Sequence, residues 1–499
     1  MIGATLDAIK ARMAGQADAV AVRTPSHDLS YGALGETAAR IAAALDRVDV
    51  GEQLPVAQLA PRSPAGIAAA VGLALAGRVY APLDASLPEP TLQAQLAALR
   101  PRALLARHGQ ADLVARLLGG APRAVGIDAD LVLYEAAASS RPLPGAAYVI
   151  FTSGSSGEPK GVVIGHDNLD AFTTAAAEHY DLSAVDRLFN PAPLHFDFSI
   201  LDVFGVLRAG GCVLCGPGDL RLPGDILEAL RRLSPTVLAG VPSFFSYLSG
   251  GRAPSSSWFP DLRRVVFGGE TFPIAALRRW MLAYPDVQFI NTYGPTETTV
   301  FVSSLRLARP PETPPPIGAP FAGVRFELVD AMGQRVSGDD AGELWIGGHT
   351  FLAQGYLDPA ATARAFLVNP LGDGVRYYRT GDLARRTPEG IVVVGRADSQ
   401  VKIAGRRIEL GAVEQALCAL DGVADAVATT LRGADGAPVG IACHVASARG
   451  PEELRAELSA VLPAYMLPRE IIVVSVIPRG RSGKLDRRAL ADREVAHAG

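Results

Sequence analysis

A loop rich in serine and glycine follows an apolar segment at residues 151–162, FTSGSSGEPKGV. Backbone N–H groups in such a turn can point inward together and form a nest that binds an anion. The loop differs from a Walker A loop because Lys160 follows Pro159, which has no N–H, and precedes Gly161. The stretch predicts a mobile phosphate-binding loop, although an ordinary surface loop can have the same composition.

The stretch NTYGPTETT at 291–299 places three different functional groups after the end of an apolar strand. The ring of Tyr293 can stack on a planar base, and the hydroxyl of Thr296 can bond a phosphate. The carboxylate of Glu297 can hold Mg²⁺, because this ion is usually bound by one or two carboxylates together with phosphate oxygens.

Two further stretches carry charged residues in glycine-containing turns. In YRTGDLA (378–384), Asp382 can accept both hydroxyls of a ribose, or it can simply cap the turn. In RGRSGKLDR (479–487), Lys484 lies between arginines, an arrangement also typical of a solvated basic tail. Taken together, the four stretches offer sites for phosphate, base, ribose and metal, plus one lysine.

The elements that must position these loops alternate between apolar strands and helices, which favours an α/β chain with largely parallel sheets. Helices are predicted at 67–76 and 92–99, and strands at 103–105, 146–151, 209–215, 236–240, 265–268 and 287–292.

The pattern changes after the proline-dense connector 308–320. VRFELVD, GELWIGG and GIVVVG predict a small antiparallel β unit. From about residue 397 the chain reads strand, turn, strand, helix, and then repeats short strands and helices as a compact α+β module. We therefore predict a domain at 1–397 and a smaller one at 398–499, with a hinge at Asp398.

Composition excludes several classes of protein. Of 499 residues, 49% are hydrophobic and 20% charged, the net charge is −4, and no long basic run suggests nucleic acid as a partner. The N-terminus predicts an amphipathic helix instead of a signal peptide. The longest apolar run, 65–77, is too short to cross a bilayer, so we expect a cytoplasmic protein with no membrane partner.

Cysteine usage argues against disulfides, since only four cysteines occur. Cys212 and Cys215 form a CxxC, but in a strand positions i and i+3 face opposite sides, so the two thiols should not converge. We expect a short buried strand there instead of a redox or metal site.

The order and spelling of the motifs resemble the adenylate-forming superfamily, which comprises acyl-CoA synthetases, luciferases and the adenylation domains of nonribosomal peptide synthesis. The resemblance covers nearly the whole chain. It implies a large N-terminal domain of two mixed α/β sheets plus a small β unit, followed by a small mobile α+β domain. The matching motifs are LSYGAL, LAGRVYAPLD, FTSGSSGEPKG, HFDFS, NTYGPTE, GELWIGG, YRTGDL, GRADSQVKIAGRRIEL and GKLDR.

The resemblance also implies an ATP site with Mg²⁺. Asn291 and Tyr293 would meet adenine, Asp382 and Arg396 the ribose, and Glu297 the metal. Lys484 would lie between the substrate carboxylate and the α-phosphate, with Thr296 as a further catalytic residue. The remaining ATP-binding positions carried over are Thr152, Ser153, Gly154, Ser155, Ser156, Lys160, Gly269, Thr292, Gly294 and Val393.

The branch of the superfamily is indicated by HFDFSILDVF, 195–204, because Asp197 matches the residue that holds the substrate α-ammonium in amino-acid-activating members. The alternative is that Asp197 only caps the following helix. A carboxylate is costly to bury unless a cation meets it, so we expect Asp197 to be buried with the substrate supplying the cation.

The side chain of the amino acid would meet a wall without charged residues, which would reject acidic and basic side chains. We expect a small to medium neutral substrate such as alanine, valine, proline or threonine. GVPSFFSYL and VVFGGETFP also look more similar to D-alanine–carrier protein ligases and other free-standing ligases than to large synthetase modules, so D-alanine is included. The wall residues implied by the resemblance are Phe198, Leu201, Ala239, Val266, Gly268, Thr292, Val300 and Phe301.

A second half-reaction is implied in which the C-terminal domain swings about Asp398 and the loop at Gly405 replaces Lys484. A phosphopantetheine thiol then attacks the adenylate, as in nonribosomal peptide or other secondary metabolite synthesis. Only 15 residues follow Lys484, so we expect the thiol on a separate carrier protein or on coenzyme A.

Two positions depart from the family pattern: Val393 stands where an aromatic residue is usual, and Ala404 replaces the arginine of KIRG. Two other readings stay open, an acyl- or aryl-CoA ligase and a nucleotide-binding protein that has lost catalysis. Asp197 disfavours the first, and Lys484, Glu297 and Asp382 disfavour the second.

Overall fold

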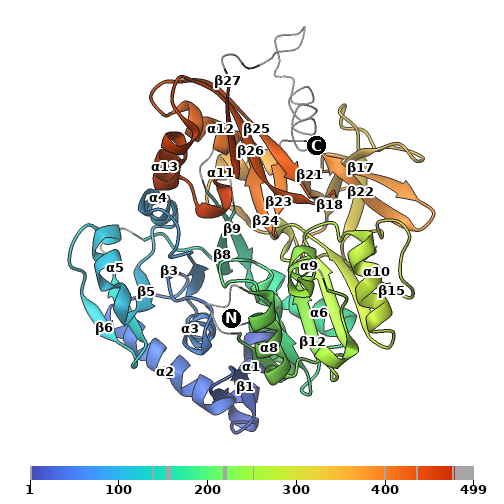
Figure 1. The fold of residues 1–499 in the computed structure, drawn as a ribbon. Helices are drawn as coiled ribbons and strands as arrows, with labels where there is room; N and C mark the ends of the chain where they lie inside the picture. The colour runs from blue at the N-terminus through green and yellow to red at the C-terminus, as the bar shows by residue number, and fades with distance from the viewer. Residues whose placement is uncertain are drawn as a thin grey trace. The chain divides into compact units, whose positions relative to one another are not determined.

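The computed structural model describes residues 3–136, 140–152, 159–216, 222–250, 252–397, 400–433, 436–474 and 477. The chain divides into two compact units (Figure 1). The first consists of Met1–Ala85, Leu96–Phe151 and Gly161–Ala397, and the second of Ser86–Gln95, Thr152–Lys160 and Asp398–Gly499.

A mixed eight-stranded sheet is built mainly from the first third of the chain. Its central strands pair in parallel, whereas β7 and β6 at one edge and β19 at the other are antiparallel. The order is β19 (Gly355–Tyr356), β9 (Lys160–Gly165), β8 (Ala146–Thr152), β4 (Val79–Pro82), β3 (Pro55–Gln58), β5 (Ala103–Arg107), β7 (Leu131–Glu135) and β6 (Ala124–Gly126).

A nine-stranded sheet follows the same plan, with a parallel centre and antiparallel edges. Its order is β16 (Ala319–Pro320), β15 (Ser303–Leu307), β14 (Gln288–Tyr293), β13 (Arg264–Gly268), β12 (Val237–Gly240), β10 (Arg187–Phe189), β11 (Cys212–Leu214), β1 (Val20–Arg23) and β2 (Asp28–Ser30).

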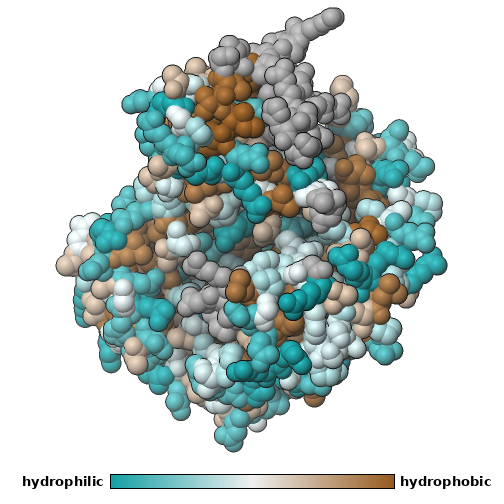
Figure 2. Space-filling model, in the orientation of Figure 1, coloured by the Kyte–Doolittle hydropathy of each residue, from teal (hydrophilic) through white to brown (hydrophobic). Residues whose placement is uncertain are grey.

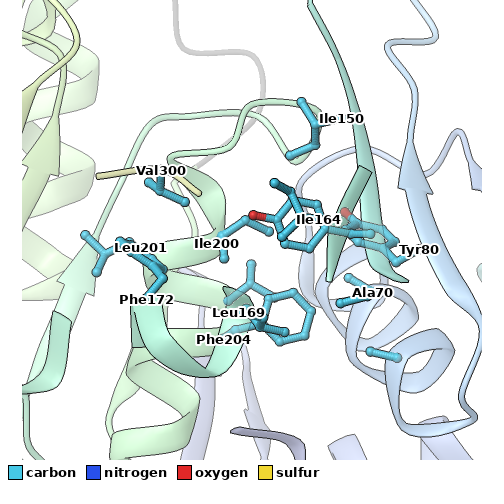
Figure 3. Close-up of a cluster of buried hydrophobic side chains, with 14 of the residues drawn as sticks. Ala70, Tyr80, Ile150, Ile164, Leu169, Phe172, Ile200, Leu201, Phe204 and Val300 are labelled. Atoms are coloured by element: carbon cyan, nitrogen blue, oxygen red, sulfur yellow. The ribbon is translucent and has the colours of Figure 1, made fainter. Parts of the chain in front are cut away.

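One buried apolar cluster joins the two sheets, because it contains side chains from both of them and from the helices between. Figure 3 shows part of this cluster, with Tyr80 and Ile164 of one sheet on one side, Leu201 on the other, and Ile200 between them. The helices that contribute to it are α1 (Ala4–Gly15), α2 (Tyr31–Arg47), α3 (Pro64–Leu75), α6 (His166–His179), the π-helix η2 (Leu201–Val206) and α7 (Leu207–Ala209).

The opposite face of the nine-stranded sheet carries a second apolar cluster, covered by α8 (Pro223–Leu233), α9 (Pro242–Ser249) and α10 (Ile274–Ala283). Strand residues alternate between the two clusters, as Val265 and Val266 illustrate, because successive side chains point to opposite faces. Other short helices are α4 (Glu89–Leu99), η1 (His108–Gln110), α5 (Ala111–Leu118), η3 (Ser256–Trp258), η4 (Thr296–Thr298) and α11 (Pro359–Ala365).

A smaller five-stranded antiparallel sheet follows the proline-dense connector. Its strands are β17 (Arg325–Val329), β18 (Gly342–Gly347), β20 (Phe366–Val368), β21 (Arg376–Thr387) and β22 (Gly390–Arg396).

The C-terminal part of the second unit has its own buried cluster. It begins with the hairpin β23 (Gln400–Ile403) and β24 (Arg406–Glu409), whose two-residue turn has positive φ at both Ala404 (51°) and Gly405 (76°), as a type I′ turn requires. Its other elements are α12 (Leu410–Cys418), β25 (Val423–Arg432), β26 (Pro438–Ser447), α13 (Pro451–Val461), η5 (Ala464–Met466) and β27 (Glu470–Val474).

These elements confirm the predicted fold class, with two mixed sheets, a small β unit and a smaller α+β module. One strand prediction was wrong at its start: α7 continues to Ala209 and ends at Gly210 with φ 85°, so β11 begins only at Cys212. The hydrophobic side chains at 209 and 213 hid the helix end, which the following glycine marks.

Cys212 and Cys215 are both buried and free, and they belong to the two different clusters on opposite faces of the sheet. The prediction that these thiols do not converge is therefore confirmed. Burial raises the pKa of the Cys215 thiol to about 11, which disfavours the reactive thiolate form.

Within the described part of the chain, no helix combines the length and apolar character needed to span a membrane. Exposed apolar side chains such as Val185, Leu282 and Met332 are scattered over different elements, and Figure 2 shows small hydrophobic areas among hydrophilic ones. Isolated exposed apolar residues are ordinary for a protein surface.

Candidate active site

The carboxyl ends of β12, β13 and β14 place the predicted wall residues on one face of the nine-stranded sheet. Ala239 is paired with Val266, and Gly268 with Thr292, in the parallel register. Paired residues on neighbouring strands point to the same face of a sheet, and so do residues two apart on one strand. Ala239 and Val266 belong to the cluster shared with the other sheet, so Gly268 and Thr292 face that cluster as well. Ligand sites in α/β sheets form beyond such strand ends.

A glycine is required at position 268 by its neighbours. A Cβ added there would lie 2.4 Å from Thr292 Oγ1 and 3.0 Å from Phe301 Cε1. Thr292 Oγ1 donates to the carbonyl of Phe267 at 3.0 Å, so it is held against this spot. Gly268, Thr292 and Phe301 therefore converge, as the predicted wall requires.

Two phenylalanines from different segments complete this part of the wall. The rings of Phe198 and Phe301 lie edge to face with centroids 4.8 Å apart, a favoured aromatic geometry. All eight predicted wall residues are buried, and Leu201 and Val300 are labelled in Figure 3 within the shared cluster.

The backbone beside Glu297 is strained. Thr299 and Val300 have φ values of 62° and 69°, which are rare for β-branched residues. The N–H of Phe301 donates to the carbonyl of Thr299 at 2.9 Å, which closes a γ-turn around Val300. Backbone strain of this kind clusters at functional sites because the surrounding structure must impose it.

Asp197 lies in the turn before the helix that contains η2, next to the buried Phe198. It is half-buried, so the expectation of a buried carboxylate was wrong. The turn buries Phe198 and Ser199 as the helix begins, whereas His195, Phe196 and Asp197 stay partly accessible. The hydroxyl of Tyr148 is near enough that the Asp197 charge adds to the effect of burial in raising the pKa of Tyr148.

Tyr293, Asp382 and Arg396 form a compact polar cluster. The Tyr293 hydroxyl donates to Asp382 Oδ2 at 2.6 Å, and Arg396 Nη1 donates to Asp382 Oδ1 at 2.5 Å. Burial, with the Asp382 charge, raises the pKa of Tyr293, so the phenol stays protonated and can donate. Both carboxylate oxygens keep a lone pair that can accept a further hydroxyl.

We predict that Tyr293→Phe raises the KM for ATP by about threefold to tenfold. Asp382 loses a hydrogen bond of roughly 1.5–3 kcal/mol to a charged group, partly replaced when ribose hydroxyls donate to it. Steady-state pyrophosphate exchange measures the effect. Tyr377→Phe is the matched control, because the Tyr377 hydroxyl also donates to a carboxylate, that of Asp373, at 2.8 Å. Tyr377 lies in β21, the strand that carries Asp382. Equal KM changes in both variants would contradict the prediction.

Glu297 is buried in η4, and its Oε1 accepts a hydrogen bond from the Tyr356 hydroxyl at 2.8 Å. Its neighbour Thr296 is half-buried. In the part of the chain that the structure describes, no three His, Cys, Asp or Glu side chains gather to hold a metal. Glu297 is the residue that would hold Mg²⁺, an ion that proteins usually bind through one or two carboxylates together with substrate phosphates.

The sequence profile of the AMP-binding enzyme family matches residues 9–357, and that of the AMP-binding enzyme C-terminal domain matches residues 412–484. The chain belongs to the AMP-binding enzyme family. This confirms the resemblance to the adenylate-forming superfamily and the prediction of an AMP-forming ligase.

Curated relatives match this chain over only part of their own length. Phenyloxazoline synthase MbtB of Mycobacterium tuberculosis is 35% identical over 97% of this chain and 34% of its own length. Phosphinothricin tripeptide synthetase PhsC of Streptomyces viridochromogenes is 36% identical over 95% of this chain and 44% of its own length. The chain thus spans less than half of these relatives, and they do not support the expected similarity to D-alanine–carrier protein ligases.

Solved structures of AMP-binding enzymes share the fold. The Vibrio cholerae adenylation domain AlmE, in complex with glycyl-adenosine-5'-phosphate, has a TM-score of 0.86 at 23% identity and covers 99% of this chain and 98% of its own. PA1221, a nonribosomal peptide synthetase protein with adenylation and PCP domains, has a TM-score of 0.80 at 26% identity over 98% and 84%.

The structure also shows the surroundings of other residues that are predicted to bind ATP in this AMP-binding enzyme. Asn291 Nδ2 donates to the carbonyl of Pro316 at 2.8 Å, which leaves its Oδ1 to accept. Gly269 has φ 86°, and a Cβ on Gly294 would lie 2.6 Å from Phe301 Cα. Val393 is half-buried and pairs with Ala384.

The structure describes only part of the predicted phosphate-binding loop. Thr152 and Lys160 are half-buried, and Thr152 Oγ1 donates to the Lys160 carbonyl at 3.5 Å. Ser153, Gly154, Ser155, Ser156, Asp398 and Lys484 lie outside the described residues, so their roles stay predictions.

Sequence reasoning missed the groups that hold the candidate residues. Tyr356 orients Glu297 from a strand far along the chain. Thr380 Oγ1 accepts the N–H of Asp382 at 3.0 Å and donates to the carbonyl of Leu344 at 2.6 Å. Of these two residues, only Thr380 had a signal in the sequence near its partner, because it belongs to the same YRTGDL motif as Asp382.

Proposed function

We propose that the protein activates a small to medium neutral α-amino acid as an aminoacyl-adenylate and then transfers it to the phosphopantetheine thiol of a carrier protein. The observation that carries the proposal is the half-buried Asp197 next to a buried wall without a charged member. A carboxylate at the edge of an apolar wall suits a substrate with a cationic head and a neutral side chain.

In the first half-reaction, a carboxylate oxygen of the amino acid attacks the α-phosphorus of ATP and the bond to pyrophosphate breaks. Both reactants are anions, so the enzyme must supply positive charge and in-line positioning. We assign ribose binding to Asp382, oriented by Tyr293 and Arg396. We assign neutralisation of the carboxylate and α-phosphate to Lys484, and Mg²⁺ at Glu297 would offset phosphate charge.

The test is ATP–pyrophosphate exchange with a panel of neutral amino acids, each beside its desamino analogue. We expect exchange with one or a few amino acids and little with any analogue. Equal exchange with both sets would replace this proposal with an acyl-CoA ligase, and no exchange with any acid would favour a protein that only binds nucleotide.

The supporting observation for a carrier comes from relatives, since PA1221 contains a PCP domain beside its adenylation domain. We assign the thiol-transfer step to the β23–β24 turn at Gly405. We predict that Gly405→Val keeps exchange within about threefold and slows thioester formation at least tenfold, because a β-branched residue at φ 76° costs about 1–2 kcal/mol locally.

Radiolabelled amino acid loaded onto a holo carrier protein measures this second step. Gly436→Val is the matched control, because Gly436 has a similar φ of 77° and open space where a Cβ would stand. Loss of both half-reactions in Gly405→Val, or loss of thioester formation in the control as well, would contradict the assignment.

A further inference from the structure

A buried ion pair lies behind the loop that carries Asp197. Arg62 precedes α3, and its Nη2 donates to Asp202 Oδ2 within the π-helix η2. The Asp202 side chain is 0% exposed and that of Arg62 is 12% exposed. Asn190 Nδ2 also donates to Asp202, with 3.3 Å to Oδ1, so both carboxylate oxygens are used.

The same two donors also hold the backbone of the loop 190–198. Arg62 Nη1 donates to the carbonyl of Ala192 at 3.2 Å, and Asn190 Nδ2 donates to the carbonyl of Phe198 at 2.9 Å. Inside the loop, the N–H of Ala192 donates to Asn190 Oδ1 at 2.9 Å. The loop is thus tied near its start and at its end to one buried pair.

Stability alone does not explain this pair. Removing two charges from water is expensive, and well-packed apolar residues in place of a buried ion pair are often equally stable or more so. Burial raises the pKa of Asp202 even with Arg62 beside it, which shows the cost of charging this carboxyl. The π-helix around Asp202 is a second unusual feature, because π-helical turns are rare and are frequently found at functional sites.

We propose that Arg62, Asp202 and Asn190 are positioning residues that fix the loop 190–198, so that Asp197 and Phe198 meet the amino group and side chain of the substrate. The inference rests on the proposed function and deepens it, because it names the residues that set specificity from behind the wall. It concerns amino-acid affinity and not ATP affinity, since the Tyr293, Asp382 and Arg396 cluster shares none of these contacts.

The decisive variant is the double replacement Arg62→Met with Asp202→Leu, which removes both charges and leaves no unpaired ion. We expect the KM for the best wild-type amino acid to rise about tenfold, the KM for ATP to change less than twofold, and the thermal midpoint to stay within a few degrees. The preference for the amino acid over its desamino analogue should fall about tenfold, an effect that general loosening would not produce.

Arg62→Lys is the second variant, because a lysine keeps the charge at Asp202 but cannot also reach the Ala192 carbonyl with a rigid fork. We expect a KM rise of about threefold to fivefold. If the double variant fails to fold, this variant decides the question. Arg264→Lys is the matched control, since Arg264 is buried and paired with Asp186 at 3.2 Å at the start of β13.

Amide hydrogen exchange of the loop 190–198 gives a readout independent of turnover. We expect at least tenfold faster exchange there in the double variant and unchanged exchange in the Arg264→Lys control. An unchanged amino-acid KM with unchanged loop exchange would overturn the inference, as would equal rises in the KM for ATP. If instead the wild type prefers desamino acids, the proposed function fails, and the loop readout still tests the positioning role.

Discussion

Replacing Lys484 with alanine should lower amino-acid-dependent pyrophosphate exchange by about 10²–10³-fold, the usual effect of removing one donor that stabilises developing charge. Lys484 is the last residue matched by the C-terminal family profile. Adenylate formation joins two anions, so this lysine is expected to act mainly in the transition state and to change kcat more than the KM for either substrate.

ATP binding by Lys484→Ala, measured by titration calorimetry, should stay detectable because the base and ribose contacts belong to other residues. Arg481→Ala is the matched control: it removes a positive charge three residues away in the same sequence segment and should cost less than about threefold. Exchange within a few-fold of wild type in Lys484→Ala would show that another group supplies the positive charge.

Replacing Asp197 with alanine should raise the KM for the amino acid by about tenfold to 150-fold, since a charged hydrogen bond of roughly 1.5–3 kcal/mol is lost. The KM for ATP should change less than about twofold. Asp197→Asn keeps the shape and removes the charge, so it should show most of the same loss.

The desamino analogue provides the internal control for this prediction. It has no ammonium group, so its weak binding should be similar in wild type and Asp197→Ala. A parallel loss for the amino acid and its analogue would mean that Asp197 supports the loop instead of the substrate.

Local patterns in the sequence were sufficient for most elements. The strand predicted at 265–268 is Arg264–Gly268, and the helix predicted at 67–76 is Pro64–Leu75. These segments are apolar runs with clear flanking signals. Their hydrophobic periodicity and the flanking turn residues are therefore enough to predict the type and position of each element. The end of α7 was missed because apolar residues continue on both sides of Gly210, which hid the helix-ending signal of this glycine.

Contacts between distant segments could not be predicted in the same way. Arg62 and Asp202 are separated by 140 residues, and Tyr356 and Glu297 by 59. Neither Arg62 nor Tyr356 has a local pattern that names its partner, because the pairing depends on how two sheets and their helices pack. The partial exposure of Asp197 was missed for the same reason. A side chain in a turn between buried residues can point toward the core or toward solvent, and the sequence does not show which.

The left-handed backbone at Val300 means that the eight wall positions are not equivalent starting points for redesigning substrate choice. At Ala239 or Val266, which lie in regular strands, a new side chain changes volume and little else. At position 300 every replacement also changes how well the residue tolerates φ 69°. Glycine or asparagine relieves about 1–2 kcal/mol of backbone cost, whereas other β-branched residues retain it. In combinatorial libraries that vary position 300, selection will therefore favour residues that stabilise the fold as well as residues that fit the substrate. Stability and substrate specificity should be measured separately for such variants.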